Sequence, residues 1–200
     1  MIGLPFETFD DFDGIVYFVK GFKSIYVVSG KNNPKKLMLT VSASNFVPKP
    51  ATPFQWIPQD SIESLKEKQN YLKDKLRLKN VRFNYHDAEL SHLEAAFARG
   101  DRKLSKVILD AVEKGARFDA WHEYFNFNRY TEAFKDNGLS SEAYANRAMD
   151  VNEPLYWDHI DVHVRKSYLT KELQKAETGA LTPDCRGNCL GCGYEGVCLK

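Results

Sequence analysis

Cysteines provide the clearest chemical signal in this chain of 200 residues. All four lie near its end, at Cys185, Cys189, Cys192 and Cys198. Several glycines stand between them, and glycine permits the positive φ angles that a short backbone needs to aim several thiolates at one point. Thiolates bind zinc and iron–sulfur clusters, so the sequence predicts one site holding either structural zinc or a [4Fe–4S] cluster. The alternative is free or disulfide-bonded cysteines at a frayed terminus.

Two smaller groups of residues could also do chemistry. His159, Asp161 and His163 alternate in the sequence, so on a strand they would share one face and could bind a metal or transfer protons. Hydrogen-bonded surface or core groups are the simpler interpretation. Arg99, Asp101 and Arg102 could bind a substrate anion, although a helix cap with exposed arginines is the more ordinary interpretation.

The overall composition limits the choice of partners. With 28 basic and 27 acidic residues the formal net charge is +1, which offers no electrostatic footprint for nucleic acid or an anionic membrane. No apolar run approaches the roughly 20 residues of a membrane span, and the N-terminus lacks the pattern of a secretory signal. Clustered cysteines that act as metal ligands rather than as disulfides are typical of a reducing compartment. We therefore expect a cytoplasmic location without membrane contact.

The first part of the chain has the pattern of a parallel α/β unit. Residues 1–5 fit a strand end and a turn, and residues 37–42 fit another strand. Between them Thr8 can cap a helix ending near Ser29, along which apolar residues recur at helical spacing: Phe9, Phe12, Ile15, Val19, Phe22 and Ile25. Strand, helix and strand in this order favour parallel strands joined by a crossover helix.

A proline-rich loop and a mainly helical region follow. Three prolines within residues 48–53 exclude regular structure and stiffen the loop. We then expect a helix from about Asp60 with the seam Ile62, Leu65, Gln69, Leu72 and Leu76, a strand at 81–85, helices at about 90–97, 104–112, 121–134 and after Ser140, and a last helix at 166–177 that ends at Gly179. Residues 154–164 are expected to be irregular or extended.

Two of these segments resemble the later strands of radical-SAM barrels. Residues 1–8, Met-Ile-Gly-Leu-Pro-Phe-Glu-Thr, look like the late-strand motif G-x-P-x-E-T and precede an acidic helix start. Residues 41–53 end in Phe-Val-Pro-Lys-Pro-Ala-Thr-Pro and resemble the next strand and its loop. Methylthiotransferases carry a comparable F-x-P-x-P-x-T-P run. Both motifs stand in the family's order, with one helix between them.

Later segments narrow the resemblance. Residues 93–102, 115–119, 157–161 and 184–186 are similar to one uncharacterised radical-SAM group, whose full-length members resemble cobalamin-binding radical-SAM proteins. The likeness covers essentially the whole chain. It implies an α/β fold, the C-terminal part of a radical-SAM (β/α) partial barrel followed by a mostly helical region and a cysteine-rich tail.

The resemblance also implies domains, cofactors and site residues. The barrel part would span residues 1–79, the helical region 80–180 and the four-cysteine tail 181–200. In the complete family a [4Fe–4S] cluster reduces SAM to a 5′-deoxyadenosyl radical, and related members bind cobalamin. The residues implied for cofactor binding are Gly3, Pro5, Glu7, Pro48, Lys49 and Thr52. Without the resemblance, the same residues fit a capped turn and a rigid connector.

The chain departs from the family pattern, because the first half of the barrel and its cluster loop are missing. A fragment, a split gene product or a truncated chain would explain this, with the N-terminal half of the barrel as the expected partner. Cys185-x3-Cys189-x2-Cys192 has the spacing of the missing cluster loop. It follows the barrel motifs rather than preceding them, so we expect an accessory site.

The sequence thus predicts the C-terminal portion of a radical-SAM enzyme of unknown substrate, inactive by itself. The competing class is a non-enzymatic zinc-binding interaction module, for which RNA contact is unsupported by the net charge.

Overall fold

The structure, a computed structural model, describes residues 1–29 and 37–194. These residues form two compact units, each of which is described by itself. Unit 1 comprises Met1–Phe46 and Asp60–His92, and unit 2 comprises Val47–Gln59 and Leu93–Lys200. The predicted domain boundary after Lys79 lies inside unit 1, where it falls between two paired strands of one sheet.

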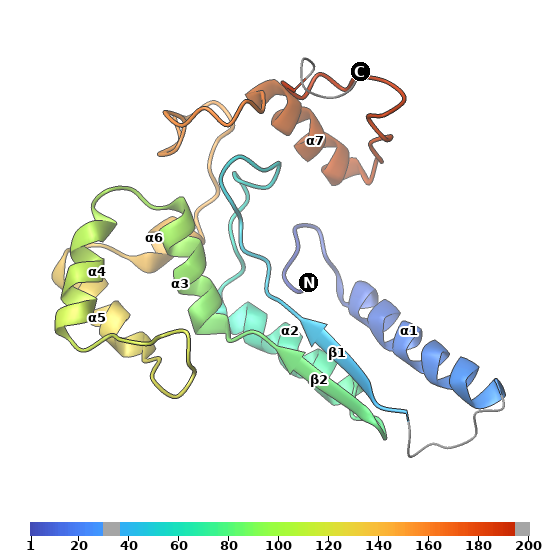
Figure 1. The fold of residues 1–200 in the computed structure, drawn as a ribbon. Coiled ribbons are helices and arrows are strands. Elements are labelled where there is room, and N and C mark those ends of the chain that lie inside the picture. The colour runs from blue at the N-terminus through green and yellow to red at the C-terminus, as the bar shows by residue number, and fades with distance from the viewer. Residues whose placement is uncertain (30–36, 195–200) are drawn as a thin grey trace. The chain divides into compact units, whose positions relative to one another are not determined.

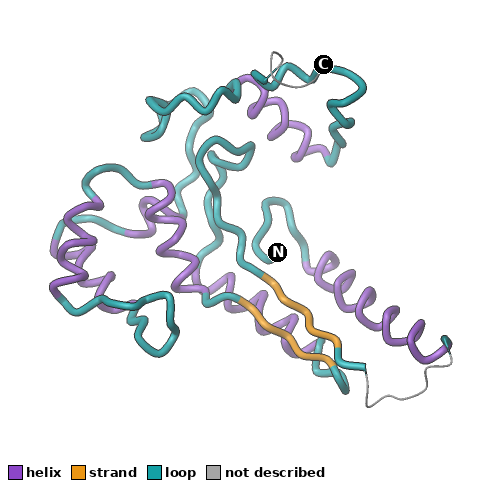
Figure 2. The backbone as a smooth tube through the Cα atoms, in the orientation of Figure 1, coloured by secondary structure: helices purple, strands orange, loops and turns teal. Residues whose placement is uncertain are grey.

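Unit 1 contains a small parallel sheet. Strand β1 (Leu39–Ala43) pairs with β2 (Val81–Tyr85) in parallel, with Leu39 opposite Val81, and the crossover helix α2 (Ile62–Lys75) connects them. The two strands run side by side in Figure 1, and Figure 2 marks them in orange. Ile2 forms a further parallel bridge to Asn45, the second residue after β1. The predicted order of parallel segments is therefore confirmed.

Helices cover one face of this sheet. The core of unit 1 joins Phe12, Val16 and Val19 of α1 (Phe9–Val28) with Leu72 of α2 and the inward side chains of both strands. The alternate strand residues Thr40, Ser42, Arg82 and Asn84 are polar and exposed. Because successive side chains of a strand point to opposite faces, the second face of the sheet is polar.

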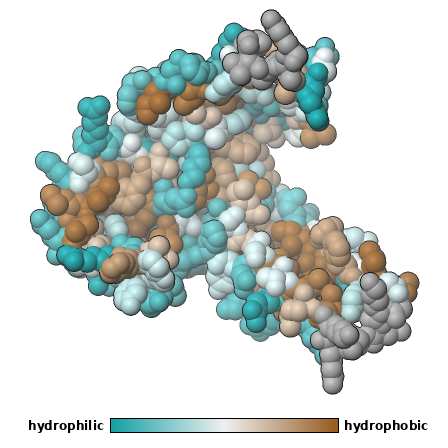
Figure 3. Space-filling view, viewed as in Figure 1, coloured by the Kyte–Doolittle hydropathy of each residue, from teal (hydrophilic) through white to brown (hydrophobic). Residues whose placement is uncertain are grey.

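Helix α1 begins as its sequence predicts, although its apolar face is only partly buried. The backbone N–H of Thr8 donates to Oδ2 of Asp11 at 2.8 Å, which closes the first turn. Phe22 and Ile25, expected in the core, are 50% and 67% exposed. The helix is longer than the strands that it covers, so its second half extends past the core. Apolar side chains at this end of the molecule colour the surface brown in Figure 3.

Unit 2 is built from short helices. Helix α3 (Ala88–Arg99) runs across the division at His92, and α4 (Leu104–Glu113), α5 (Phe127–Asp136), α6 (Ser141–Ala145) and α7 (Lys166–Thr178) follow. One core packs parts of α3, α4, α5 and α6 together, and a second joins Trp56, Met149 and Leu155 to the buried face of α7. Figure 2 shows the long loop between α6 and α7.

The helix ends of unit 2 confirm most of the predicted signals. The side chain of Ser140 accepts a hydrogen bond from the Ala143 N–H at 3.2 Å, and Gly179 ends α7 with φ +68°. The prediction of one aromatic helix over 121–134 is wrong, because Trp121 lies in a turn and α5 begins only at Phe127. Asn126 caps α5 by accepting from the Asn128 N–H at 3.0 Å, which starts the helix late.

At a coarse level the described residues are α/β, rich in helix, with a small parallel sheet. The barrel remains an expectation from sequence. Among the described residues no helix is long and apolar enough to cross a bilayer.

Candidate functional site

The turn after the first parallel bridge brings three predicted site residues together. Gly3 has φ +78°, and its N–H donates to Oε1 of Glu7 at 2.8 Å. A Cβ at Gly3 would lie 2.9 Å from Cδ2 of Leu65, so both the φ angle and the space demand glycine. Pro5 lies half-buried in the same turn. Glu7 thus fixes the turn, as its position in the motif suggested.

Glu7 also belongs to a partly buried ion cluster. Nζ of Lys68 lies 2.7 Å from Oδ2 of Asp60 and 3.4 Å from Oε1 of Glu7, with only 15% of the Lys68 side chain and 6% of the Glu7 side chain exposed. Burial alone would lower the pKa of Lys68, but the hydrogen bond and charge of Asp60, with those of Glu7, raise it. The lysine therefore stays charged and ties α2 to the turn.

A buried amide network follows the carboxyl ends of the strands. Nδ2 of Asn45 donates to Oγ of Ser91 at 2.9 Å, and Nε2 of Gln69 donates to Oδ1 of Asn45 at 2.9 Å and to the His86 carbonyl at 2.9 Å. Open parallel sheets place ligands at this edge. The available sequence signal was Gln69, a polar residue within an apolar seam, but its partners could not be read from the sequence.

The proline loop in unit 2 holds the other three predicted residues. Pro48 is fully buried, and Lys49 pairs with Glu94 of α3. The hydroxyl of Thr52 donates to the Lys49 carbonyl at 2.7 Å. Lys49 and Thr52 thus bind within the protein itself, and neither is among the residues that line the two cavities described for this loop.

Gln55, which sequence reasoning did not single out, organises the loop. Its buried Oε1 accepts from the Ala51 N–H at 2.9 Å and from Nε1 of Trp157 at 2.8 Å. Ala51 adopts φ +57°, an uncommon conformation for a residue with a Cβ. One carbonyl oxygen therefore holds a strained turn and an indole that is distant in sequence.

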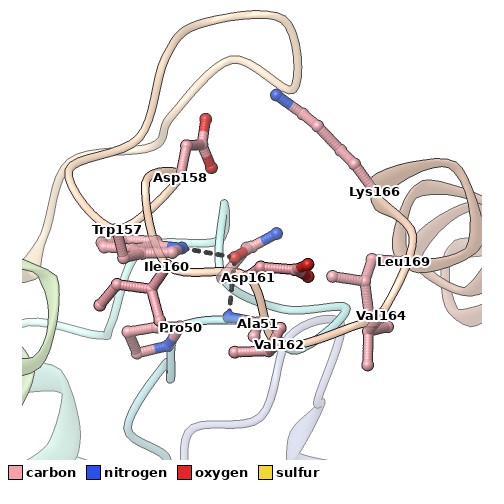
Figure 4. A pocket seen from close by; sticks show the side chains of 11 residues that line it. Pro50, Ala51, Trp157, Asp158, Ile160, Asp161, Val162, Val164, Lys166 and Leu169 are labelled. Atoms are coloured by element: carbon pink, nitrogen blue, oxygen red, sulfur yellow. Dashed lines mark hydrogen bonds between the residues drawn. The ribbon is translucent and has the colours of Figure 1, made fainter. Parts of the chain in front are cut away.

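A cavity of about 370 Å³ lies beside this arrangement. Its apolar lining comes from Trp157, Val164 and Leu169, and its charges come from Asp158, Asp161 and Lys166. Figure 4 shows Lys166 extending from the start of α7 across the opening from Asp158. Such a lining suits a small ligand with an apolar body and charged groups at its open side.

The cysteine tail folds back on α7. Hydrogen bonds join Thr182 to Glu172 and Lys175, and the Arg165 N–H donates to the Cys192 carbonyl at 2.8 Å. Burial alone would raise the pKa of Glu172, yet the hydrogen bonds from Lys175 and Thr182 lower it. The tail is thus attached both along α7 and at Arg165, the residue before its first turn.

Glycine makes the second attachment close. Gly193 has φ +119°, and a Cβ there would lie 2.0 Å from the His163 carbonyl oxygen. The hydroxyl of Tyr194 donates to the Val162 carbonyl at 2.8 Å. The prediction that glycines allow sharp turns among the cysteines is confirmed at Gly191 and Gly193, which both have positive φ.

Three of the predicted ligands lie within the described residues. Cys185 and Cys189 are exposed and Cys192 is half-buried, all as free thiols, while Cys198 lies outside the described residues. Burial raises the pKa of the Tyr168 phenol, and the negative charge of Glu172 raises it further. In the described part of the chain no three potential ligands converge as a metal group.

The structure contradicts the predicted strand face of histidines and the predicted anion-binding role of Arg99. His159, Asp161 and His163 do not share a strand face, because residues 159–163 form no strand and His163 has φ +59°. Arg99 is not an exposed anion binder, because it is 0% exposed and donates to the carbonyls of Tyr144, Ala145 and Arg147. Burial lowers its pKa to about 10.

Comparison with protein-family models, curated proteins and solved structures returned no match for this chain.

Proposed function

We propose that this chain is the C-terminal portion of a radical-SAM enzyme that carries an accessory cysteine-ligated site. The observation that carries the proposal is the Gly3–Glu7 turn, where the G-x-P-x-E-T resemblance coincides with a glycine-dependent turn at the carboxyl end of a parallel segment. Parallel strands with helices on one face are also part of the arrangement of a barrel wall.

The turn formed by Gly3, Pro5 and Glu7 is compatible with a role in SAM binding. By the resemblance, Gly3, Pro5 and Glu7 of unit 1 would contribute to SAM binding. Pro48, Lys49 and Thr52 of unit 2 belong to the proposal through the resemblance alone, because Lys49 and Thr52 bind within the protein. The Gly3 N–H already donates to Glu7, so the turn would contribute shape and close backbone approach rather than a free donor. Bound SAM would supply the radical chemistry, whereas these residues would position it and exclude water.

Soft thiolates at Cys185, Cys189, Cys192 and Cys198 suit a [4Fe–4S] cluster or zinc. The hydrogen bond from the Arg165 N–H to the Cys192 carbonyl and the bonds of Thr182 to Glu172 and Lys175 hold this tail beside α7, which is compatible with one site there. Substrate, cobalamin and the N-terminal half of the barrel as partner belong to the proposal through the resemblance alone. So does a cytoplasmic location.

Anaerobic purification followed by iron, sulfide and zinc analysis tests the accessory site. About four irons with matching sulfide per chain would support the cluster. Replacing the four cysteines by serine should abolish metal binding, while Asn188→Ser in the same tail should retain it. Metal content that survives the cysteine replacement, or no metal in the original chain, would contradict the proposal that the cysteines form one metal site.

The enzyme assignment has a separate test, in which the chain is incubated with SAM and a strong reductant. The isolated chain is expected to yield no 5′-deoxyadenosine, because its cysteines form an accessory site. Deoxyadenosine formation by these residues alone would contradict that role. Restoration of cleavage when a matching N-terminal half is added would support the barrel.

A zinc-binding interaction module is the second candidate. The backbone hydrogen bond from the Arg165 N–H to the Cys192 carbonyl favours it, because that bond holds one predicted ligand in a fixed loop beside the start of α7. One zinc per chain, no sulfide and a rise in thermal stability with zinc would support this reading over the cluster.

A further inference from the structure

A second cavity in unit 2 combines cations with aromatic rings. It measures about 760 Å³ and shares Pro50, Trp157 and Ile160 with the smaller cavity. Its basic residues are Arg102, Lys103 and His159, and its rings are Tyr156 and Trp157. The chain is nearly neutral overall, so this local grouping is not a consequence of composition.

The cations at this cavity are available for a ligand. Within residues 1–29 and 37–194 the Arg102 guanidinium and the His159 imidazole form no hydrogen bond or ion pair. Nζ of Lys103 lies 4.0 Å from Oδ2 of Asp101, and the lysine side chain is 73% exposed. Such a pair contributes little in water, so the lysine can turn to another anion.

Asp101 is the one acidic residue at this cavity, and it already serves the protein. Its Oδ1 accepts from the Lys103 N–H at 2.8 Å and from the Tyr144 hydroxyl at 3.4 Å. Only 16% of its side chain is exposed. The charge facing the cavity is therefore positive, with two permanent cations against one engaged carboxylate.

The aromatic residues offer a stacking surface. The Trp157 indole is held by the hydrogen bond from its Nε1 to Gln55, which fixes the ring before any ligand arrives. Tyr156 is 46% exposed, and its ring lies 6.4 Å from that of Tyr144. Rings beside accessible cations recognise flat bases attached to phosphate, because stacking holds the base while Arg and Lys hold the anion.

We propose that this cavity binds a nucleotide unit, with Tyr156 and Trp157 against the base and Arg102 and Lys103 on the phosphate. An anion without a ring would leave the apolar lining unused, and a base without phosphate would leave the cations unused. The unit could come from a free nucleotide or from the 5′ end of a single-stranded RNA. This proposal does not depend on the radical-SAM assignment.

Isothermal titration calorimetry of the full chain with AMP, adenosine and a 5′-phosphorylated oligouridylate tests it. Arg102→Gln is expected to weaken binding of the phosphorylated probes about tenfold, since it removes a charged hydrogen-bond donor. Tyr156→Leu should weaken it by a similar factor through lost stacking. Arg117→Gln, an exposed arginine outside the cavity, is the matched control and should leave affinity unchanged.

The arms separate the sources of the nucleotide. Tighter binding of AMP than of the oligonucleotide identifies a free nucleotide, and the reverse order identifies an RNA end. Either result supports the cavity if Arg102→Gln reduces it and Arg117→Gln does not. No saturable binding at millimolar probe, equal affinity for adenosine and AMP, or an equal loss in the control would overturn the proposal.

Discussion

Replacing Glu7 by alanine should destabilise unit 1 through the turn at its first parallel segment. The carboxylate, 6% exposed, accepts from the Gly3 N–H at 2.8 Å and lies 3.4 Å from Nζ of Lys68. An orphaned buried N–H costs about 1–3 kcal/mol, and Lys68 keeps Asp60 as its nearer partner, so we expect a loss of about 2 kcal/mol. Glu7→Gln retains an acceptor for Gly3 and should lose only about 1 kcal/mol.

The measurement is urea unfolding followed by hydrogen-exchange mass spectrometry, which reports the free energy of unfolding of α2 and β1 separately from unit 2. Glu67→Ala on the exposed side of α2 is the matched control, expected within about 0.5 kcal/mol of the original chain. Equal small effects of Glu7→Ala and Glu67→Ala would refute the reasoning that this carboxylate holds the turn.

Three further substitutions test the rest of the structure. Arg99→Met should cost unit 2 about 3–5 kcal/mol in urea unfolding, because it orphans buried backbone carbonyls; a loss below about 1 kcal/mol would contradict this. Glu172 has a pKa lowered below its usual 4.5, so its stabilisation is present above that pH and lost as pH falls through the lower folded value. The Tm difference between the original chain and Glu172→Gln should therefore shrink on acidification, and a constant difference would refute it. Gly193→Ala should displace the tail and speed alkylation of Cys192, whereas Gly187→Ala, with open space around it, should not; equal rates would exclude the close approach.

Local signals predicted most elements correctly because they act within a few residues. Ser61 accepts from the Ser64 N–H at 3.1 Å at the start of α2, and Gly179 ends α7 in the left-handed conformation. Alternation of apolar residues placed β1 within one or two positions of its observed bounds. Each of these signals needs only the residue and its immediate neighbours.

Polar burial was not predictable in the same way. Arg99 belongs to a charged stretch that suggests a surface, yet its guanidinium lies among carbonyls at the end of α6. Gln69 lies on an apolar seam, yet its partners Asn45 and His86 come from other elements. A charged or amide group can be buried wherever enough acceptors converge, and convergence is a property of packing rather than of local sequence.

By itself the sequence determined the cysteine and glycine content of the tail, the order of the parallel segments and the positions of most helix ends. These features follow from residue type and from the spacing of apolar residues. Only the tertiary structure decided that the Gln55 side chain holds Trp157, that Glu7 closes the Gly3 turn with Lys68, and that the tail lies against α7. The contact between Gln55 and Trp157 joins residues 102 positions apart. Local propensities carry no information about such a pair, because it forms only when the loop and the segment before α7 have packed together.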